Sequence, residues 1–334
     1  MLESTSTAPM QPRMRHDRSL LFLLRAFFCR GVLSDSSRAI DSGMQKSRFY
    51  LGGRNRAKLI SNDALYGKRA DLINRSEEGP KFSMERWFNC SKAKPQALLK
   101  LFCFPWAGGG SNHYAMKWSP LLPDSIEVCA IRLPGRESRL NEKPMSDPTP
   151  LLDVLAEKIA IRAAGKPFAF WGHSMGSALA FRTAIRLEKV HNMTPKCLLL
   201  SGAKPPQFWK RSDAVEWHLL PDAEFLQFIR RLGGTPEQVL KNADLVKFFL
   251  PILRSDFELA HRLRYDVSED FWDKEKVSSP LVIFGGEDDL SSRDLSGWKD
   301  MTGKTPHTFP GGHFYFMSKG NESSLLSIIS KEVQ

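Results

Sequence analysis

Cysteine is scarce in this sequence, and the spacing of the few cysteines present follows no paired pattern. The 334 residues contain five cysteines, an odd number. They are widely spaced and include no Cys-x-x-Cys pair: Cys29, Cys90, Cys103, Cys129 and Cys197. Disulfide-stapled secreted domains and structural zinc sites need cysteines at short, regular spacings. We therefore expect reduced thiols in a cytoplasmic (cytosolic) protein, and no metal.

Long hydrophobic runs are also missing. A helix needs about 20 apolar residues to cross a bilayer, and the strongest run, SLLFLLRAFFCRGVL at 19–33, is interrupted by Arg25 and Arg30. The run lacks a clean secretory cleavage site, and an Arg-rich presequence for an organelle is the better of the targeting alternatives. We favour a flexible extension with a local apolar patch over either, and expect no stable membrane insertion.

The excess of basic over acidic residues lies almost entirely in the first part of the chain. The net charge of +11 comes from 48 Lys and Arg against 37 Asp and Glu. Residues 1–94 hold 18 basic and 9 acidic residues, whereas the remaining 240 hold 30 and 28. A nucleic-acid-binding fold carries its basic excess on the folded body. The even balance there argues against a nucleic-acid partner.

The chain divides into two parts of different character. Residues 1–83 are rich in Ser, Arg and Asn and show no sustained period, so we predict a basic, flexible N-terminal extension. Residues 84–334 are predicted to form the folded domain, and Met84 is a candidate internal start site.

Apolar runs alternate with helix-length segments from Leu98 onward. The runs are continuously apolar, as in strands buried on both faces of a parallel sheet. They occupy residues 98–104, 126–133, 166–172, 196–202, 280–286 and 307–310, with predicted helices at 150–164 and 175–189. The pattern predicts an α/β fold with a mostly parallel sheet and helices on both faces. In such sheets the chemistry lies beyond the carboxyl ends of the strands.

A Gly-x-Ser-x-Gly string, Gly172 to Gly176, follows the third run and precedes a helical segment. The string alone is common by chance, but strand, sharp turn and helix are the context of a nucleophile elbow. There the serine hydroxyl is exposed above the sheet, and the helix N-terminus offers a backbone N–H to an oxyanion. We predict Ser174 as a catalytic nucleophile, with the Met175 N–H as an oxyanion donor.

A serine nucleophile requires a base, and on this fold an acid and then a histidine follow it in the chain. Of eight histidines, only His307 and His313 lie beyond the acidic turn GGEDDL at 285–290. His313, on a loop after Pro-Gly-Gly, is the better base. Asp288 and Asp289 are adjacent candidates for the acid, and one turn can aim only one of them at the imidazole.

A glycine-rich turn, PWAGGGS at 105–111, follows the first predicted strand. It matches neither common phosphate-binding pattern. Two interpretations remain equal on the residues alone: a plain tight turn, or a loop whose backbone N–H groups face a carbonyl oxygen.

Six segments together resemble the type II thioesterases, and in particular the stand-alone fatty acid synthase thioesterases of vertebrates. They are LFCFPWAGGGSNHY, RLPGRESRLNEKP, FWGHSMGSALAFRTA, LGGTPEQVL, PILRSDFEL and FPGGHFYF, and the resemblance covers roughly residues 86–334. It implies an α/β-hydrolase fold with a helical lid, Asp289 as the triad acid and the Ala107 N–H as a second oxyanion donor.

The resemblance also implies a substrate and a partner. The substrate is a fatty acyl thioester on the phosphopantetheine arm of the acyl carrier protein of fatty acid synthase, released as a medium-length acid. No cofactor is needed, and we expect a monomer. The alternatives are a carboxylesterase, lipase or acyltransferase on the same fold, or a binding protein that has kept a hydrolase shell.

Residues 205–275 are too long for a simple crossover and are the expected lid insertion. Apolar residues at helical spacing are candidates for the wall of an acyl channel, with ordinary core packing as the alternative: Phe225, Phe228, Ile229, Leu232, Leu245, Phe248 and Phe249. Basic residues in the same segment would attract an acidic carrier protein, unless they are simply a solvated face: Lys210, Arg211, Arg230 and Arg231.

Overall fold

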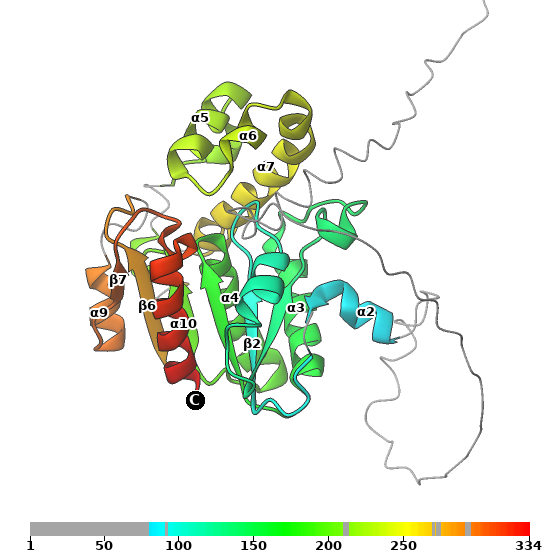
Figure 1. The fold of residues 1–334 in the computed structure, drawn as a ribbon, viewed down its shortest axis with the longest axis vertical. Helices are drawn as coiled ribbons and strands as arrows, with labels where there is room; N and C mark the ends of the chain where they lie inside the picture. The colour runs from blue at the N-terminus through cyan, green and yellow to red at the C-terminus, as the bar shows by residue number, and fades with distance from the viewer. Residues whose placement is uncertain (1–79, 91–92, 210–213, 269–270, 272–274, 291–294) are drawn as a thin grey trace, which may run out of the picture.

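The fold is an open sheet covered by helices, with a further group of helices beyond the carboxyl ends of the strands (Figure 1). The computed structural model describes residues 80–90, 93–209, 214–268, 271, 275–290 and 295–334. The predicted extension, residues 1–83, lies outside this range except for its last four residues. These begin helix α2, Pro80–Trp87.

Seven strands form one sheet in the described part of the chain, in the order β1-β3-β2-β4-β5-β6-β7. All six predicted strands are confirmed: β2 Leu99–Phe104, β3 Ile126–Ile131, β4 Phe168–His173, β5 Leu198–Ser201, β6 Leu281–Gly286 and β7 His307–Phe309. They run parallel. Strand β1, Phe88–Asn89, was not predicted and pairs antiparallel with β3 at the edge.

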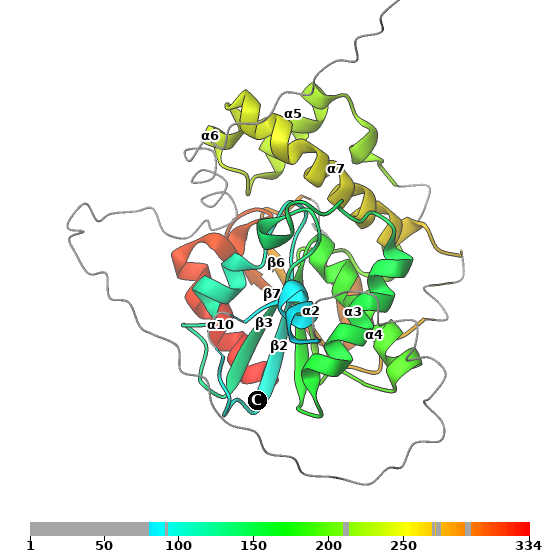
Figure 2. The same ribbon diagram turned by 90° about the vertical axis from the view of Figure 1, so that its right-hand side faces the viewer.

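The strands are buried on both faces, as their continuous apolar runs predicted. Along β2, Phe102 and Phe104 pack into one core while Leu101 and Cys103 pack into another, because side chains alternate across a strand. Helices α3, Pro148–Ala163, and α4, Met175–His191, cover the first face, and α10, Lys319–Val333, covers the second. Figure 2 shows α10 on one side of the strands and α3 and α4 on the other.

A helical insertion joins β5 to β6 and rises above the carboxyl ends of the strands (Figure 1). Its helices are α5 Asp222–Leu232, α6 Glu237–Leu240 and α7 Ala243–Tyr265. The insertion has its own apolar core, separate from the two cores of the sheet. The first half of α7 contributes to that core, and its last turns contribute Leu259 and Leu263 to the main core.

Short elements complete the described chain. They are η2 His113–Trp118, η3 Glu137–Arg139, η4 Pro206–Phe208, η6 Trp217–Leu219, α9 Ser296–Thr302 and η7 Tyr315–Met317. Across the described residues, every helix is too short or too polar to span a bilayer. The apolar stretch 19–33 lies outside them.

Candidate active site

The turn that carries Ser174 lies between the end of β4 and the start of α4. Ser174 has φ 57° and ψ −114°, a positive φ that residues with a side chain rarely adopt. Its N–H donates to the Ser201 carbonyl at 2.8 Å, which ties the turn to β5. Strand, strained turn and helix together have the form of a nucleophile elbow.

Two glycines make this turn possible. A Cβ on Gly172 would lie 2.2 Å from the Gly176 carbonyl oxygen, and a Cβ on Gly176 would lie 2.5 Å from the Phe104 oxygen. Both obstacles are backbone atoms, which cannot swing aside as a flexible side chain would. The backbone approach therefore explains both glycines of the string.

An imidazole and a carboxylate meet at the same end of the sheet. Asp289 lies three residues beyond β6, and its Oδ2 is 2.8 Å from His313 Nδ1. Asp289 is 2% exposed and His313 6%. Asp288 is exposed to solvent. Of the two adjacent aspartates that the sequence offered, Asp289 is the one that contacts the imidazole.

Ser174 and His313 line two hollows together. A small pocket of about 40 Å³ extends under the glycine-rich loop and includes Ala107 in its wall. A larger cavity of about 600 Å³ extends between the sheet and the insertion, and we call it the insertion cavity. Met175 is the first residue of α4, so its N–H is among those that a helix leaves without an intrahelical partner.

The residues expected to wall an acyl channel divide into two groups. Phe228 and Leu232 line the insertion cavity, and Ile229 and Leu232 line the small pocket. The others belong to the core of the insertion or pack against it: Phe225, Leu245, Phe248 and Phe249. The channel prediction is wrong for Phe225 and Phe249, which are almost fully buried among the insertion helices.

The basic residues of the insertion also divide. Arg231 lines the insertion cavity together with Lys204 and Arg264, two residues that sequence reasoning missed. Arg264 donates to the Ser174 carbonyl at 3.3 Å and lies over the Trp209 ring. Arg230 instead pairs with Glu237 at the surface. Lys210 and Arg211 lie outside the described residues.

A second histidine packs against His313. The His173 ring centroid lies 4.7 Å from that of His313. Its Nδ1 is hydrogen-bonded to Ser201 Oγ at 2.9 Å, and that hydroxyl is hydrogen-bonded to the Tyr315 hydroxyl at 2.8 Å. Burial holds the pKa of His173 well below its ordinary value, so its ring is neutral. The only signal in the sequence for this packing of His173 against His313 is its position directly before Ser174.

One cluster in the described part of the chain has the spacing of metal ligands. Cys90, Glu127 and Cys129 place one ligand atom each within 4.8 Å of the others. However, Glu127 accepts a hydrogen bond from Arg162 at 2.8 Å, and Lys100 Nζ lies 4.0 Å from its carboxylate. Two cationic side chains already neutralise this carboxylate, which disfavours a bound cation.

Comparison with known proteins places this geometry in a family. The thioesterase domain family matches residues 99–333. The medium-chain S-acyl fatty acid synthase thioesterase of Rattus norvegicus is 36% identical over 249 residues, which cover 74% of this chain and 92% of the rat protein. Gramicidin S biosynthesis protein GrsT of Aneurinibacillus migulanus is also 36% identical, over 70% of this chain and 88% of its own.

Solved structures agree with the sequence relatives. The type II thioesterase BorB from the borrelidin biosynthetic cluster superimposes with a TM-score of 0.59 at 32% identity, over 74% of this chain and 98% of its own. The resemblance of the sequence to the type II thioesterases and the predicted α/β-hydrolase fold are thus confirmed. The chain belongs to the thioesterase domain family, whose members include thioester hydrolases of fatty acid synthase.

Proposed function

We propose that this protein hydrolyses acyl thioesters with Ser174 as nucleophile, His313 as base and Asp289 as the acid that orients the base. One observation carries the proposal: Ser174 and His313 line the same two hollows, and Asp289 holds the far side of the imidazole at 2.8 Å. The elbow geometry of Ser174 supports the first role.

The steps follow from these positions. His313 accepts the Ser174 proton, and Oγ attacks the thioester carbonyl. The backbone N–H groups of Met175 and Ala107 stabilise the oxyanion, and the carbon–sulfur bond breaks as the thiol takes the proton from His313. Water then attacks the acyl-enzyme with His313 again as base, the bond between Oγ and the acyl carbon breaks as His313 returns the proton to Ser174, and the free acid leaves.

The insertion is proposed as a lid over the acyl chain. Its cavity of about 600 Å³ lies within the size range of small-molecule sites, and the side chains of Trp217, Phe228 and Phe257 line it. In this interpretation residues 84–334 form the catalytic domain, with the lid at about 205–275, and residues 1–83 form a basic extension.

The proposed substrate is a medium-length fatty acyl chain on the acyl carrier protein of fatty acid synthase. The rat relative, named for such a synthase, is matched over 92% of its length. Basic residues at the cavity, Lys204, Arg231 and Arg264, would attract an acidic, phosphate-bearing carrier arm. We place this reaction in the cytosol and assign it to a monomer. A carboxylesterase, lipase or acyltransferase remains the alternative activity.

Parallel assays on four substrates test the proposal: acyl carrier protein thioester, acyl-CoA, p-nitrophenyl ester and triglyceride. We expect the carrier-bound thioester to give the highest kcat/KM. The Ser174→Ala variant should lose all activity and all labelling by a serine-directed phosphonate. Ser323→Ala, an exposed serine on α10, is the matched control and should behave as wild type. Preferential cleavage of triglyceride, or label on another serine, would overturn the proposal.

A further inference from the structure

A buried ion pair joins the insertion to the loop after β3. Arg136 and Asp256 are each 1% exposed. The guanidinium donates two hydrogen bonds to the carboxylate, from Nη1 to Oδ2 at 2.7 Å and from Nη2 to Oδ1 at 2.6 Å. This two-point contact fixes the orientation of both groups as well as their separation. Arg136 and Asp256 lie in two of the segments that resemble the thioesterases, and the proposed catalytic steps use neither residue.

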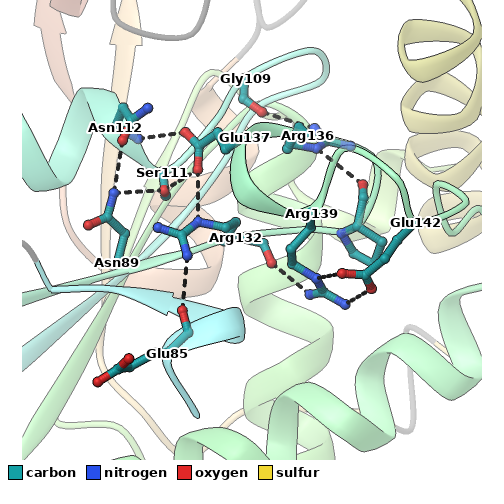
Figure 3. A network of polar contacts seen from close by, with 11 residues as sticks. Glu85, Asn89, Gly109, Ser111, Asn112, Arg132, Arg136, Glu137, Arg139 and Glu142 are labelled. Carbon is teal, nitrogen blue, oxygen red and sulfur yellow. Dashed lines mark hydrogen bonds and ion pairs between the residues drawn. The ribbon is translucent and has the colours of Figure 1, made fainter. Parts of the chain in front are cut away.

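The same two side chains hold the glycine-rich loop. The Gly108 N–H donates to Asp256 Oδ2 at 2.7 Å, and the Gly109 carbonyl accepts from Arg136 Nη1 at 2.9 Å. Figure 3 shows the contact between Arg136 and Gly109. The ion pair therefore makes hydrogen bonds to two successive residues of the loop, Gly108 and Gly109, which directly follow Ala107.

The rest of that loop is held from the β3 side. The Glu137 carboxylate accepts from the Asn112 N–H at 3.0 Å, from Arg132 Nε at 3.1 Å, and from the Ser111 hydroxyl (Figure 3). Glu137 adopts φ 53°, a strained conformation for a residue with a side chain. Strain of this kind persists only where surrounding contacts over-determine the backbone. The loop is thus held in its middle, at Gly108 and Gly109, and at its C-terminal end, at Ser111 and Asn112.

Helix α7 also packs closely against the glycine-rich loop at Gly108. A Cβ on Gly108 would lie 2.5 Å from Leu253 Cδ2, and Gly108 has φ +75°. Leu253 lies one turn before Asp256 on α7, and it belongs to the insertion core. Leu259, one turn after Asp256, belongs to the main core. Asp256 therefore lies where α7 passes from the insertion to the body.

We propose that Asp256, oriented by Arg136, is a positioning residue that holds the glycine-rich loop with the Ala107 N–H facing the oxyanion. This inference rests on the proposed function. A buried ion pair often contributes no more to stability than well-packed apolar residues of the same size would. What apolar residues cannot replace is the acceptor for the Gly108 N–H and the donor to the Gly109 carbonyl. Those two bonds are specific to the conformation of the loop.

The experiment separates positioning from stability with three variants. Asp256→Ala removes the carboxylate and with it the acceptor of the Gly108 N–H, and the double variant Arg136→Met with Asp256→Leu replaces the pair by apolar side chains. Glu127→Gln is the matched control, because Glu127 is also a buried carboxylate paired with an arginine but does not contact the loop. Each variant is measured for kcat and KM on an acyl thioester, the rate of phosphonate labelling at Ser174, and the thermal midpoint.

We expect Asp256→Ala to lower kcat and the labelling rate by about 30- to 100-fold with KM within threefold, because a misplaced oxyanion donor should cost somewhat less than its complete loss, which costs about 10² to 10³. The double variant should regain most of the thermal stability and stay equally slow. Glu127→Gln should lose stability and keep kcat within threefold.

Recovery of kcat together with stability in the double variant would overturn the inference, as would an equal loss of kcat in Glu127→Gln. Failure of the proposed function gives a different result. A wild-type protein without turnover on thioesters would refute the substrate, while the labelling rate of Ser174 would still report whether Asp256 positions the loop.

Discussion

The pairing of Asp289 with His313 yields the sharpest quantitative test. Replacing Asp289 by Asn keeps its size but puts an amide against His313 Nδ1. The carboxylate accepts from Nδ1 at 2.8 Å and is almost fully buried, so water does not weaken the contact. An amide N–H turned toward Nδ1 would move the ring proton to Nε2, and Nε2 could then no longer accept the Ser174 proton.

The corresponding change in a well-characterised serine protease lowers kcat by about 10⁴, which equals about 5.4 kcal/mol of barrier. A thiolate leaves more readily than an amine, so we expect a loss of about 10³ to 10⁴ here. Asp288→Asn is the control on the same turn. Its side chain is exposed, and its kcat should stay within about tenfold of wild type, or about 1.4 kcal/mol.

Steady-state kcat on an acyl thioester measures both variants, and circular dichroism with thermal unfolding shows that each is folded. The reasoning fails if Asp288→Asn is the slower variant. It also fails if Asp289→Asn keeps more than a tenth of wild-type kcat.

Two further predictions concern the lid and His173. Leu232 lines both hollows, so Leu232→Ala should shift the preferred chain length on C8 to C16 acyl thioesters. Phe225 lies in the insertion core, so Phe225→Ala should lower the stability by about 3–5 kcal/mol and leave the chain-length profile unchanged. Identical profiles in wild type and Leu232→Ala would contradict this. Because burial lowers the pKa of His173 in the folded state, the unfolded chain takes up the extra proton below about pH 6.5. As the pH falls below this value, the free energy of unfolding of wild type should decrease by up to about 1.4 kcal/mol per pH unit relative to that of His173→Gln. Urea unfolding at pH 7.5, 6.5 and 5.5 measures both, and a difference between the two proteins that does not change with pH would refute the prediction.

The parallel strands and the elbow could be predicted because the pattern that specifies each lies within a short stretch of the sequence. Continuous apolar runs mark strands buried on both faces, and two glycines around Ser174 mark a turn in which side chains would collide with backbone. Strand β1 was missed because two residues, Phe88–Asn89, carry no period, and only pairing with β3 makes them a strand.

The choice between Asp288 and Asp289 depended on contacts that no local pattern contains. The Asp288 N–H donates to the Gly311 carbonyl at 3.0 Å, so the acidic turn lies directly on the loop of His313. A Cβ on Gly286 would meet the Gly312 oxygen at 2.4 Å, which shows how closely the two loops approach. That approach directs Asp289 inward and Asp288 to solvent.

The sequence by itself determined where the strands lie along the chain and that a sharp turn carries Ser174, because these follow from periodicity and from steric rules that act within a few residues. The tertiary structure decided which apolar residues of α5 face the cavity, since helical spacing marks a face but not what lies against it. It alone brought Asp256 to Arg136, 120 residues away, and placed both on the glycine-rich loop. Contacts between residues so far apart in the chain are made only when packing of the whole domain brings their helices and loops together.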